Sequence, residues 1–422
     1  MISFSYKFST QVKLSTNHQT HNTCSMPTNH SPQTTDNKPI YLDHASTTPV
    51  RPEVLEAMLP YFSEKFGNPS SLHSFGEEAK KAIENSKKTI ATILNCKTDE
   101  LIFTSGGTES CNLAILGYCR ANKEKGNHII TSQVEHPAVL ECFKQLEKEG
   151  FDVTYLEVDE YGMVLPEVFK QAIRDNTIFA SFIYANNEIG TINPISELGK
   201  IARKHNIILH TDACQAGCYL PLDIQELHVD MMTLNGSKIY GPKGIGLLFS
   251  KLPPTTHHQP PAPILHGGGQ QKGLRSGTEN VPSIVGFAKA LELAQAEKES
   301  ESKRLRELQT WFLKTLQESQ TSDFRLQTLG SLTSRLPNHI SIAFPNIEAD
   351  ALVLYLSQAG IAVSTGSACA SMKNEGSHVI EALKVPKEYQ EGSIRITMGR
   401  STRKEDLEKC LEVLKEKLKL LI

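Results

Sequence analysis

The chain has 422 residues, of which 39% are hydrophobic and 22% charged, with a formal net charge of −3. This length predicts about two to three domains of a globular protein, and the charge offers no basic surface for nucleic acid. No run of about 18 apolar residues occurs, so no membrane span is predicted, and nine scattered cysteines favour a reducing compartment over a disulfide framework.

Residues 1–38 differ in composition from the rest of the chain. They are rich in Ser, Thr, Asn, Gln and His, and they hold too few recurring apolar residues to form a core, so we expect a disordered extension. A peptide for organellar import is the alternative, but such segments are usually rich in arginine and none precedes Arg51. Met26 is a second candidate start. We therefore expect a cytoplasmic protein and leave import open.

Short apolar segments alternate with helical patterns from residue 75 to 250. The expected strands are 101–104, 128–132, 152–158, 177–184, 207–212, 229–234 and 245–249, and the expected helices include 75–95, 108–121, 137–149, 166–174 and 195–205. This alternation is typical of βαβ units around a mostly parallel sheet.

The pattern changes after a long helix expected at 283–318. Strands at 338–344, 360–364 and 393–397 and helices at 349–358, 376–383 and 403–419 indicate a smaller α+β unit. The predicted fold class is α/β, with a large domain over 54–298 that holds a seven-stranded sheet flanked by helices. The small domain takes 39–53 and 299–422.

Lys238 lies where the apolar run 229–234 gives way to the tight turn NGSKIYGPKGIG. A lysine held there by rigid backbone and removed from water has a lowered pKa and is a usable amine. The alternative is a solvated loop lysine.

Two further turns carry candidate groups. In TSGGTESCN, Gly106, Gly107 and Thr108 precede a helix, which suits a phosphate, although Gly-Gly-Thr also serves as a simple helix cap. His136 opens the helix after strand 128–132, as a cap or as a catalytic group.

Polar residues thus follow several successive strands. Asn187 follows strand 177–184, while Asp212 and Gln215 end strand 207–212. Ligands of open parallel sheets bind at this carboxyl edge. With Lys238 as a Schiff-base former, Asp212 as the partner of a pyridine nitrogen and His136 on the ring face, the set suggests pyridoxal phosphate.

The motifs TSGGTESCN, VEHPAVL, YANNEIG, HTDACQ, NGSKIYGPKGIG, HGGGQQKGLRSGTEN and STGSACAS occur in this order. Over residues 39–420 the chain resembles the cysteine desulfurases of the NifS/IscS type. These are pyridoxal-phosphate enzymes of fold-type I, within the class V aminotransferase group.

The resemblance implies roles at the ring of the cofactor. Lys238 would be the Schiff-base lysine, Asp212 the pyridinium partner and Gln215 a hydrogen-bond donor to the ring hydroxyl. His136 would lie on the ring face and act as acid or base, and Asn187 would also contact the cofactor.

The resemblance also implies how phosphate and substrate are held. Gly107, Thr108 and Ser237 would bind the phosphate, with Asn235 in the same cofactor set. Thr278 would reach the cofactor of a neighbouring subunit, which implies a homodimer.

Asn187 and Arg395 would bind the carboxylate of L-cysteine. Cys369, in STGSACAS, would be the nucleophile that takes the sulfur as a persulfide and leaves alanine. The sulfur would pass to an iron–sulfur scaffold or to a carrier for tRNA thiolation.

The sequence departs from the family pattern at several positions. Ser237 stands where histidine is common, Gly107 where alanine is frequent, and Cys214 where threonine is common. We expect Ser237 to tune cofactor affinity without loss of the reaction. Longer relatives carry a further tail that contacts a scaffold protein, whereas this sequence ends at Ile422, so that contact is left open.

Two alternatives remain. One is a selenocysteine lyase or another lyase or aminotransferase, which would not need the thiol of Cys369. The other is a non-catalytic sulfur-carrier or scaffold subunit, which would be expected to lose Lys238, Asp212 or Cys369, whereas all three are present. No metal site is expected, because the cysteines lack CxxC spacing and Cys214 and Cys218 are the nearest pair.

Overall fold

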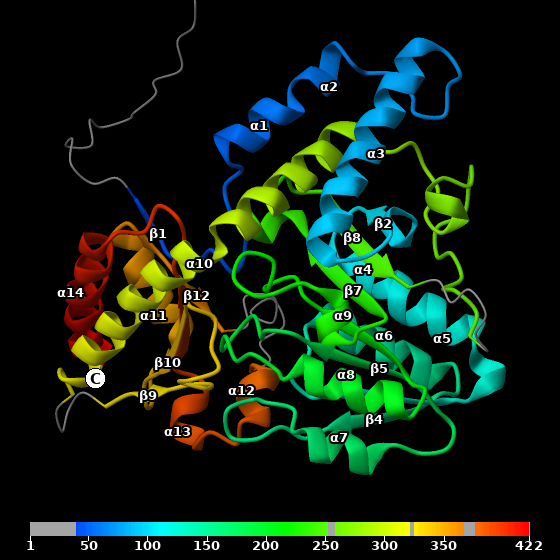
Figure 1. Ribbon diagram of the computed structural model, residues 1–422. Helices are drawn as coiled ribbons and strands as arrows, with labels where there is room; N and C mark the ends of the chain where they lie inside the picture. Colours follow the sequence, from blue (N-terminus) through cyan, green and yellow to red (C-terminus); the bar gives the residue numbers. More distant parts are fainter. Residues whose placement is uncertain (1–38, 252–257, 321–324, 367–375, 422) are drawn as a thin grey trace, which may run out of the picture. The chain divides into compact units, whose positions relative to one another are not determined.

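The computed structural model describes residues 39–251, 258–320, 325–366 and 376–421. A seven-stranded sheet is its centre, with the order β2-β8-β7-β6-β5-β3-β4 (Figure 1). All strands run in one direction except β8, which pairs antiparallel with β2 and β7. The strands are β2 (Leu101–Thr104), β3 (His128–Ser132), β4 (Asp152–Leu156), β5 (Thr177–Ile183), β6 (Ile208–Asp212), β7 (Met231–Asn235) and β8 (Gly246–Ser250). The predicted mostly parallel sheet is confirmed.

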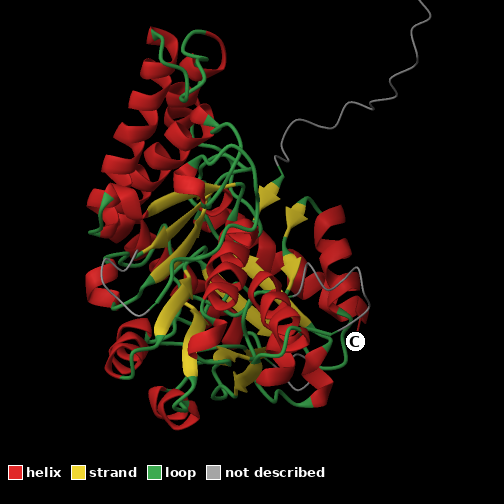
Figure 2. Cartoon of the chain, turned by 90° about the vertical axis from the view of Figure 1, so that its right-hand side faces the viewer, coloured by secondary structure: helices red, strands yellow, loops and turns green. Residues whose placement is uncertain are grey.

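Both faces of this sheet are buried. Successive side chains of a strand point to opposite faces, and those on each face pack into a hydrophobic cluster. Ala180 of β5 joins one hydrophobic cluster and its neighbour Phe179 joins another. Figure 2 shows the strands with helices on either side. The helices of this part are α3 (Ser74–Leu94), α4 (Gly107–Asn112), α5 (Tyr118–Ala121), α6 (Pro137–Lys148), α7 (Pro166–Ala172), α8 (Ile195–Lys204) and α9 (Ile224–Leu227).

The helix expected over 108–121 is a continuous helical segment of mixed type. It begins as α4, passes through a π-helical stretch at Leu113–Gly117 and ends as α5. A π-helical turn of this kind is a local irregularity within one helix and is often found near functional sites. The start of α4 faces the site described below.

A second, antiparallel sheet has the order β12-β13-β10-β9. Its strands are β9 (Gln327–Thr328), β10 (His339–Ala343), β12 (Ser364–Thr365) and β13 (Ser393–Thr397), and the helices near it are α11 (Ala349–Gln358), α12 (His378–Ala382), α13 (Lys387–Gln390) and α14 (Lys404–Leu421). β1 (Ile40–Tyr41) pairs in parallel with β11 (Ile361–Ala362). The single strand expected at 360–364 is therefore wrong: β11 and β12 belong to different sheets.

The long helix α10 (Val281–Gln317) packs against the large sheet and against the small one. Phe287, in its first half, packs with the large sheet, whereas Phe312, in its second half, packs with the small one. The short helices α1 (Pro52–Met58) and α2 (Pro60–Ser63) precede α3. Residues 39–422 form one compact unit, and the division into domains at 53 and 298 stays a prediction.

Candidate active site

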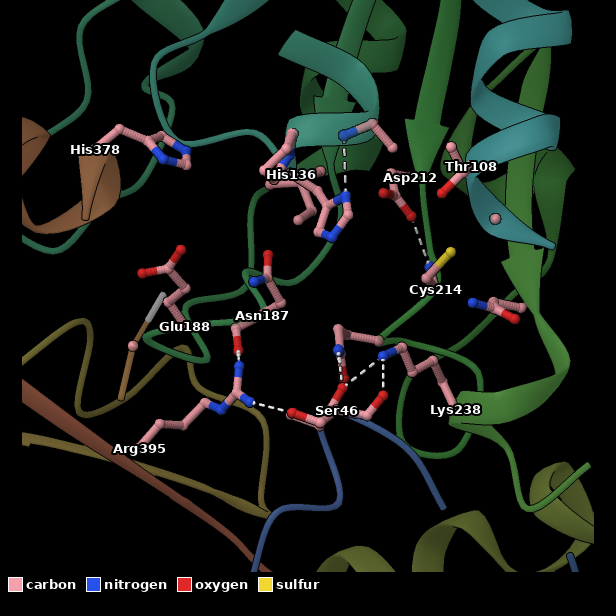
Figure 3. Close-up of a pocket in the computed structure, with 18 residues that line it drawn as sticks. Ser46, Thr108, His136, Asn187, Glu188, Asp212, Cys214, Lys238, His378 and Arg395 are labelled. Carbon is pink, nitrogen blue, oxygen red and sulfur yellow. Dashed lines mark hydrogen bonds between the residues drawn. The ribbon is translucent and has the colours of Figure 1, made fainter. Parts of the chain in front are cut away.

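A cavity of about 430 Å³ opens at the carboxyl edge of the parallel strands. Side chains from both sheets line it (Figure 3). The predicted site residues among its lining are Gly107, Thr108, His136, Asn187, Asp212, Gln215, Asn235, Lys238 and Arg395. Sequence positions almost 290 residues apart, from Gly107 to Arg395, therefore meet in one space.

Lys238 lies just beyond β7, and its ammonium group is held by backbone oxygens of the N-terminal segment. Nζ donates to the carbonyl of Ala45 at 2.8 Å and to that of Ser46. Burial lowers the pKa of Lys238, and the charge of Arg395 acts in the same direction. The amine thus loses its proton more readily than that of a solvated lysine.

Asp212 ends β6 and is 4% exposed. Its Oδ1 accepts a hydrogen bond from the backbone N–H of Cys214 at 3.0 Å. Gln215, one turn further along, donates from Nε2 to the carbonyl of Ala45 at 2.9 Å. Both side chains therefore reach the cavity from one strand end.

His136 is both a helix cap and a lining residue. It is the N-cap of α6, and its Nδ1 accepts from the N–H of Ala138 at 3.1 Å. The neutral ring consequently carries its proton on Nε2. Burial lowers the pKa of His136, which keeps the ring neutral at physiological pH. The two functions proposed for this residue are compatible.

Arg395 of β13 joins the small sheet to the site. Its guanidinium donates to the carbonyl of Asn187 at 2.8 Å, to Asp43 Oδ1 at 2.9 Å and to Ser46 Oγ at 2.7 Å. The residue is 3% exposed, and its buried Nε has no partner among the described residues. Three of the five N–H groups are thus used, and the N–H of Nε and one of Nη1 remain for an acceptor.

Three predicted residues are placed apart from this set. The hydroxyl of Ser237 lies 3.4 Å from Asn235 Oδ1, and Ser237 is not among the lining residues. Thr278 is exposed and also outside the lining. Cys369 falls within residues 367–375, outside the described residues.

Nine further residues line the cavity, and four of them carry polar or backbone contacts that the sequence did not predict: Ala45, Ser46, Glu188 and His378. Ala45 and Ser46 follow β1 as the other site residues follow their strands, which is a usable signal. Glu188 adjoins Asn187, and His378 opens the helix after the Cys369 segment. Nothing in their own spacing marks these two.

Two absences hold for the described part of the chain. It contains no group of three or more His, Cys, Asp or Glu side chains arranged to hold a metal ion. None of its helices is both long and apolar enough to cross a membrane.

Comparison with known proteins identifies the family of this chain. The model of the class-V aminotransferase family matches residues 40–410. This chain belongs to that family. The cysteine desulfurase IscS of Dictyoglomus turgidum is 50% identical over 375 residues, which cover 89% of this chain and 93% of the relative. The cysteine desulfurase IscS of Methanosarcina thermophila is 47% identical over 90% of this chain and 92% of that protein.

Solved structures of the family agree with the fold. A NifS-like protein superposes with a TM-score of 0.84 at 35% identity, covering 91% of this chain and all of its own. SspA in complex with cysteine superposes with a TM-score of 0.73 at 37% identity, over 85% of this chain and 98% of that one. The resemblance to NifS/IscS-type cysteine desulfurases and the fold-type I architecture are thereby confirmed.

Proposed function

We propose that this chain is a cysteine desulfurase that uses pyridoxal 5′-phosphate and leaves sulfur as a persulfide on Cys369. Ser46 carries the proposal. Its carbonyl accepts from the amine of Lys238, and its hydroxyl accepts from the guanidinium of Arg395 at 2.7 Å. The amine of Lys238 and the guanidinium of Arg395, which can bind a carboxylate, thus lie on either side of Ser46. A site for a small α-amino acid needs both groups.

The residues around Lys238 fit pyridoxal phosphate. Asp212, buried at the end of β6, would hold the protonated ring nitrogen, His136 would lie on the ring face, and Gln215 would donate to the ring hydroxyl. The bound cofactor supplies an electron sink for the reacting carbon. Asn187 would also contact the cofactor.

The start of α4 would hold the phosphate. Gly107 and Thr108 begin this helix and line the cavity, and the free N–H groups of a helix start favour an anion. Asn235 ends β7 and lines the cavity, and Ser237 follows it in the next turn. Ser237 reaches the phosphate in this proposal only if its hydroxyl leaves Asn235.

Arg395 would bind the carboxylate of L-cysteine. Its unpartnered Nε gives that carboxylate a donor in addition to Nη1, which now donates to the carbonyl of Asn187, whereas Nη2 bonds both Asp43 and Ser46. The amine of Lys238, whose pKa is lowered, would accept and return protons at the α carbon and its neighbours. The ring of His136 would donate its Nε2 proton there.

The sulfur step balances without a further reactant. The thiol of Cys369 and L-cysteine give a persulfide on Cys369 and L-alanine. A sulfur–sulfur bond forms as the carbon–sulfur bond breaks, and the electron pair left on carbon takes up a proton. The persulfide would then pass to an iron–sulfur scaffold or a carrier for tRNA thiolation. The scattered cysteines favour a reducing compartment, and we propose the cytoplasm.

A second copy of the chain would complete the enzyme. Thr278 is exposed and outside the cavity of its own chain, so a contact with a cofactor phosphate requires a neighbour. Exposed apolar side chains recur on and just after α1 and α2, each about half exposed or more: Leu55, Leu59, Phe62 and Phe66. An exposed stripe of this kind is typical of an interface. Sedimentation of the purified protein should give a dimer.

The test compares the wild type with Lys238→Ala after purification with pyridoxal phosphate. The wild type should carry a visible absorption band of the bound cofactor and form alanine and sulfide from L-cysteine with a thiol reductant. Lys238→Ala should form no alanine above background. A wild type without the band, or alanine formation by Lys238→Ala at the wild-type rate, would overturn the proposal.

A further inference from the structure

Glu188 lies between the two described ends of the segment that carries Cys369. It is 4% exposed and lines the cavity. Its Oε2 accepts a hydrogen bond from Ser377 Oγ at 2.5 Å, and a Cβ atom built on Gly366 would lie 3.1 Å from the same oxygen. Gly366 precedes residues 367–375 and Ser377 follows them closely. One carboxyl group therefore bonds Ser377 on one side of this segment and lies close to Gly366 on the other.

The direction of the hydrogen bond is set by the second bond of the same hydroxyl. Ser377 is the N-cap of α12, and its Oγ accepts from the N–H of Ile380 at 3.2 Å. The single hydroxyl hydrogen is then left for Glu188. The Oγ atom of Ser377 thus caps α12 and also bonds the start of this helix to Glu188 in the wall of the cavity.

His378 provides a second anchor for the same helix. Its Nε2 bonds the carbonyl of Glu135 at 2.9 Å, and the residue lines the cavity beside Glu188 (Figure 3). Two consecutive residues, Ser377 and His378, therefore attach the start of α12 to two different loops of the large sheet. The start of α12 is fixed relative to the cavity by both bonds.

The side chain of Glu188 is not needed to shape its own loop. Asn186 does this: its Oδ1 accepts from the N–H groups of Glu188 and Ile189 at 2.8 and 3.0 Å, and its Nδ2 donates to the carbonyl of Val134 at 2.8 Å. Loss of the Glu188 carboxyl group should therefore leave the loop in place and affect mainly the contact with Gly366 and Ser377.

We propose that Glu188 is a positioning residue for the sulfur-transfer step, in which its carboxyl group bonds Ser377 and lies beside Gly366, on either side of residues 367–375. This inference rests on the proposed function of Cys369 as the nucleophile. Reacting groups need near-attack geometry, and a displacement of about 1 Å costs on the order of 100-fold in rate. Steps that involve only Lys238 and the cofactor should not depend on this contact.

The experiment uses the full-length protein loaded with pyridoxal phosphate and four variants: Glu188→Ala, Glu188→Gln, Ser377→Ala and the double variant Glu188→Ala/Ser377→Ala. Three quantities are measured: cofactor content, the change in its absorption with L-cysteine, and the single-turnover rate of persulfide formation on Cys369 by mass spectrometry. Glu157→Ala, at an exposed residue paired with Lys384, is the matched control.

We expect Glu188→Ala to keep its cofactor content and the L-cysteine concentration that gives half of the absorption change. Its persulfide rate should fall by about 10- to 100-fold. Glu188→Gln should recover most of that rate, because its amide oxygen still accepts from Ser377. The double variant should be no slower than the slower single variant, since both substitutions remove one contact.

Two results would overturn the inference. One is a persulfide rate within about twofold of the wild type in both Glu188→Ala and Ser377→Ala. The other is a loss of rate matched by an equal loss of cofactor or of the absorption change, because this would mean general damage to the site. If Glu188→Ala does not fold, Ser377→Ala and Glu188→Gln give the same comparison. A wild type without cofactor absorption would overturn the proposed function, and this inference with it.

Discussion

The sulfur atom of Cys214 lies 2.8 Å from the position that a Cβ atom of residue 107 would occupy. That separation is shorter than any ordinary contact between a carbon and a sulfur atom. The resemblance singles out Gly107 and Cys214 separately, and the structure brings the two residues together. The thiol of Cys214 fills the space that an alanine side chain at 107 would need.

Gly107→Ala should therefore weaken cofactor binding. Overpacking at a buried contact costs about 1–3 kcal/mol, or roughly 5- to 150-fold in the dissociation constant. Titration of the cofactor-free protein with pyridoxal phosphate measures it. Gly107→Ala/Cys214→Ala should regain most of the affinity, and Cys214→Ala is the control. Equal affinity of Gly107→Ala and the wild type would show that the two positions are independent.

Glu135 should make stability depend on pH. It is fully buried, and burial raises its pKa to about 8 from 4.5, although the hydrogen bonds from Ser132 and Ile183 act in the opposite direction. Between pH 4.5 and 8 the folded protein keeps this proton and the unfolded chain releases it. The folded state then binds more protons, so the free energy of unfolding falls as pH rises through this window.

Glu135→Gln removes this loss, because its amide cannot ionise and its oxygen still accepts both hydrogen bonds. The free energy of unfolding of the variant, relative to that of the wild type, should rise by up to about 1.4 kcal/mol per pH unit between pH 5 and 8. Urea unfolding of both proteins at several pH values measures the difference. A difference that stays constant from pH 5 to 8 would mean that the carboxyl group keeps an ordinary pKa in the folded protein.

Arg395→Lys should weaken the binding of L-cysteine and leave the cofactor in place. A lysine cannot offer the planar pair of donors that a carboxylate accepts, and each charged hydrogen bond contributes about 1.5–3 kcal/mol. We expect the half-saturating L-cysteine concentration to rise about 10- to 150-fold. Arg400→Lys, at a partly exposed arginine that pairs with Glu297, is the control. An unchanged half-saturating concentration in Arg395→Lys would exclude Arg395 from substrate binding.

Much of the fold follows from periodicity alone. Each strand of the large sheet begins and ends within two residues of its predicted position, because buried parallel strands are short apolar runs bounded by turns. The strand expected at 360–364 fails for a specific reason. Val363 separates two pairs of residues that hydrogen-bond to different partners, β1 and β13, and a sequence pattern does not reveal the partner of a strand.

The site was predictable where residues follow the strands of the large sheet. Lys238, Asp212 and His136 come from such positions. Ser46 also follows a strand, β1, so its place near the site was predictable, although its bond to Arg395 was not. Glu188 was missed because its contact, with Ser377, is made with a distant part of the chain and leaves no local pattern in the sequence. The coupling of Gly107 to Cys214 was invisible for the same reason.

We expect Cys369 to take up the sulfur of L-cysteine. The most direct measurement is the mass of the peptide that contains Cys369 after one turnover of the cofactor-loaded protein with L-cysteine, compared with Cys369→Ala. We predict the gain of one sulfur atom on that peptide and an equal amount of alanine, with neither product formed by Cys369→Ala. Alanine formed by Cys369→Ala at the wild-type rate would contradict the account and indicate a lyase that needs no thiol.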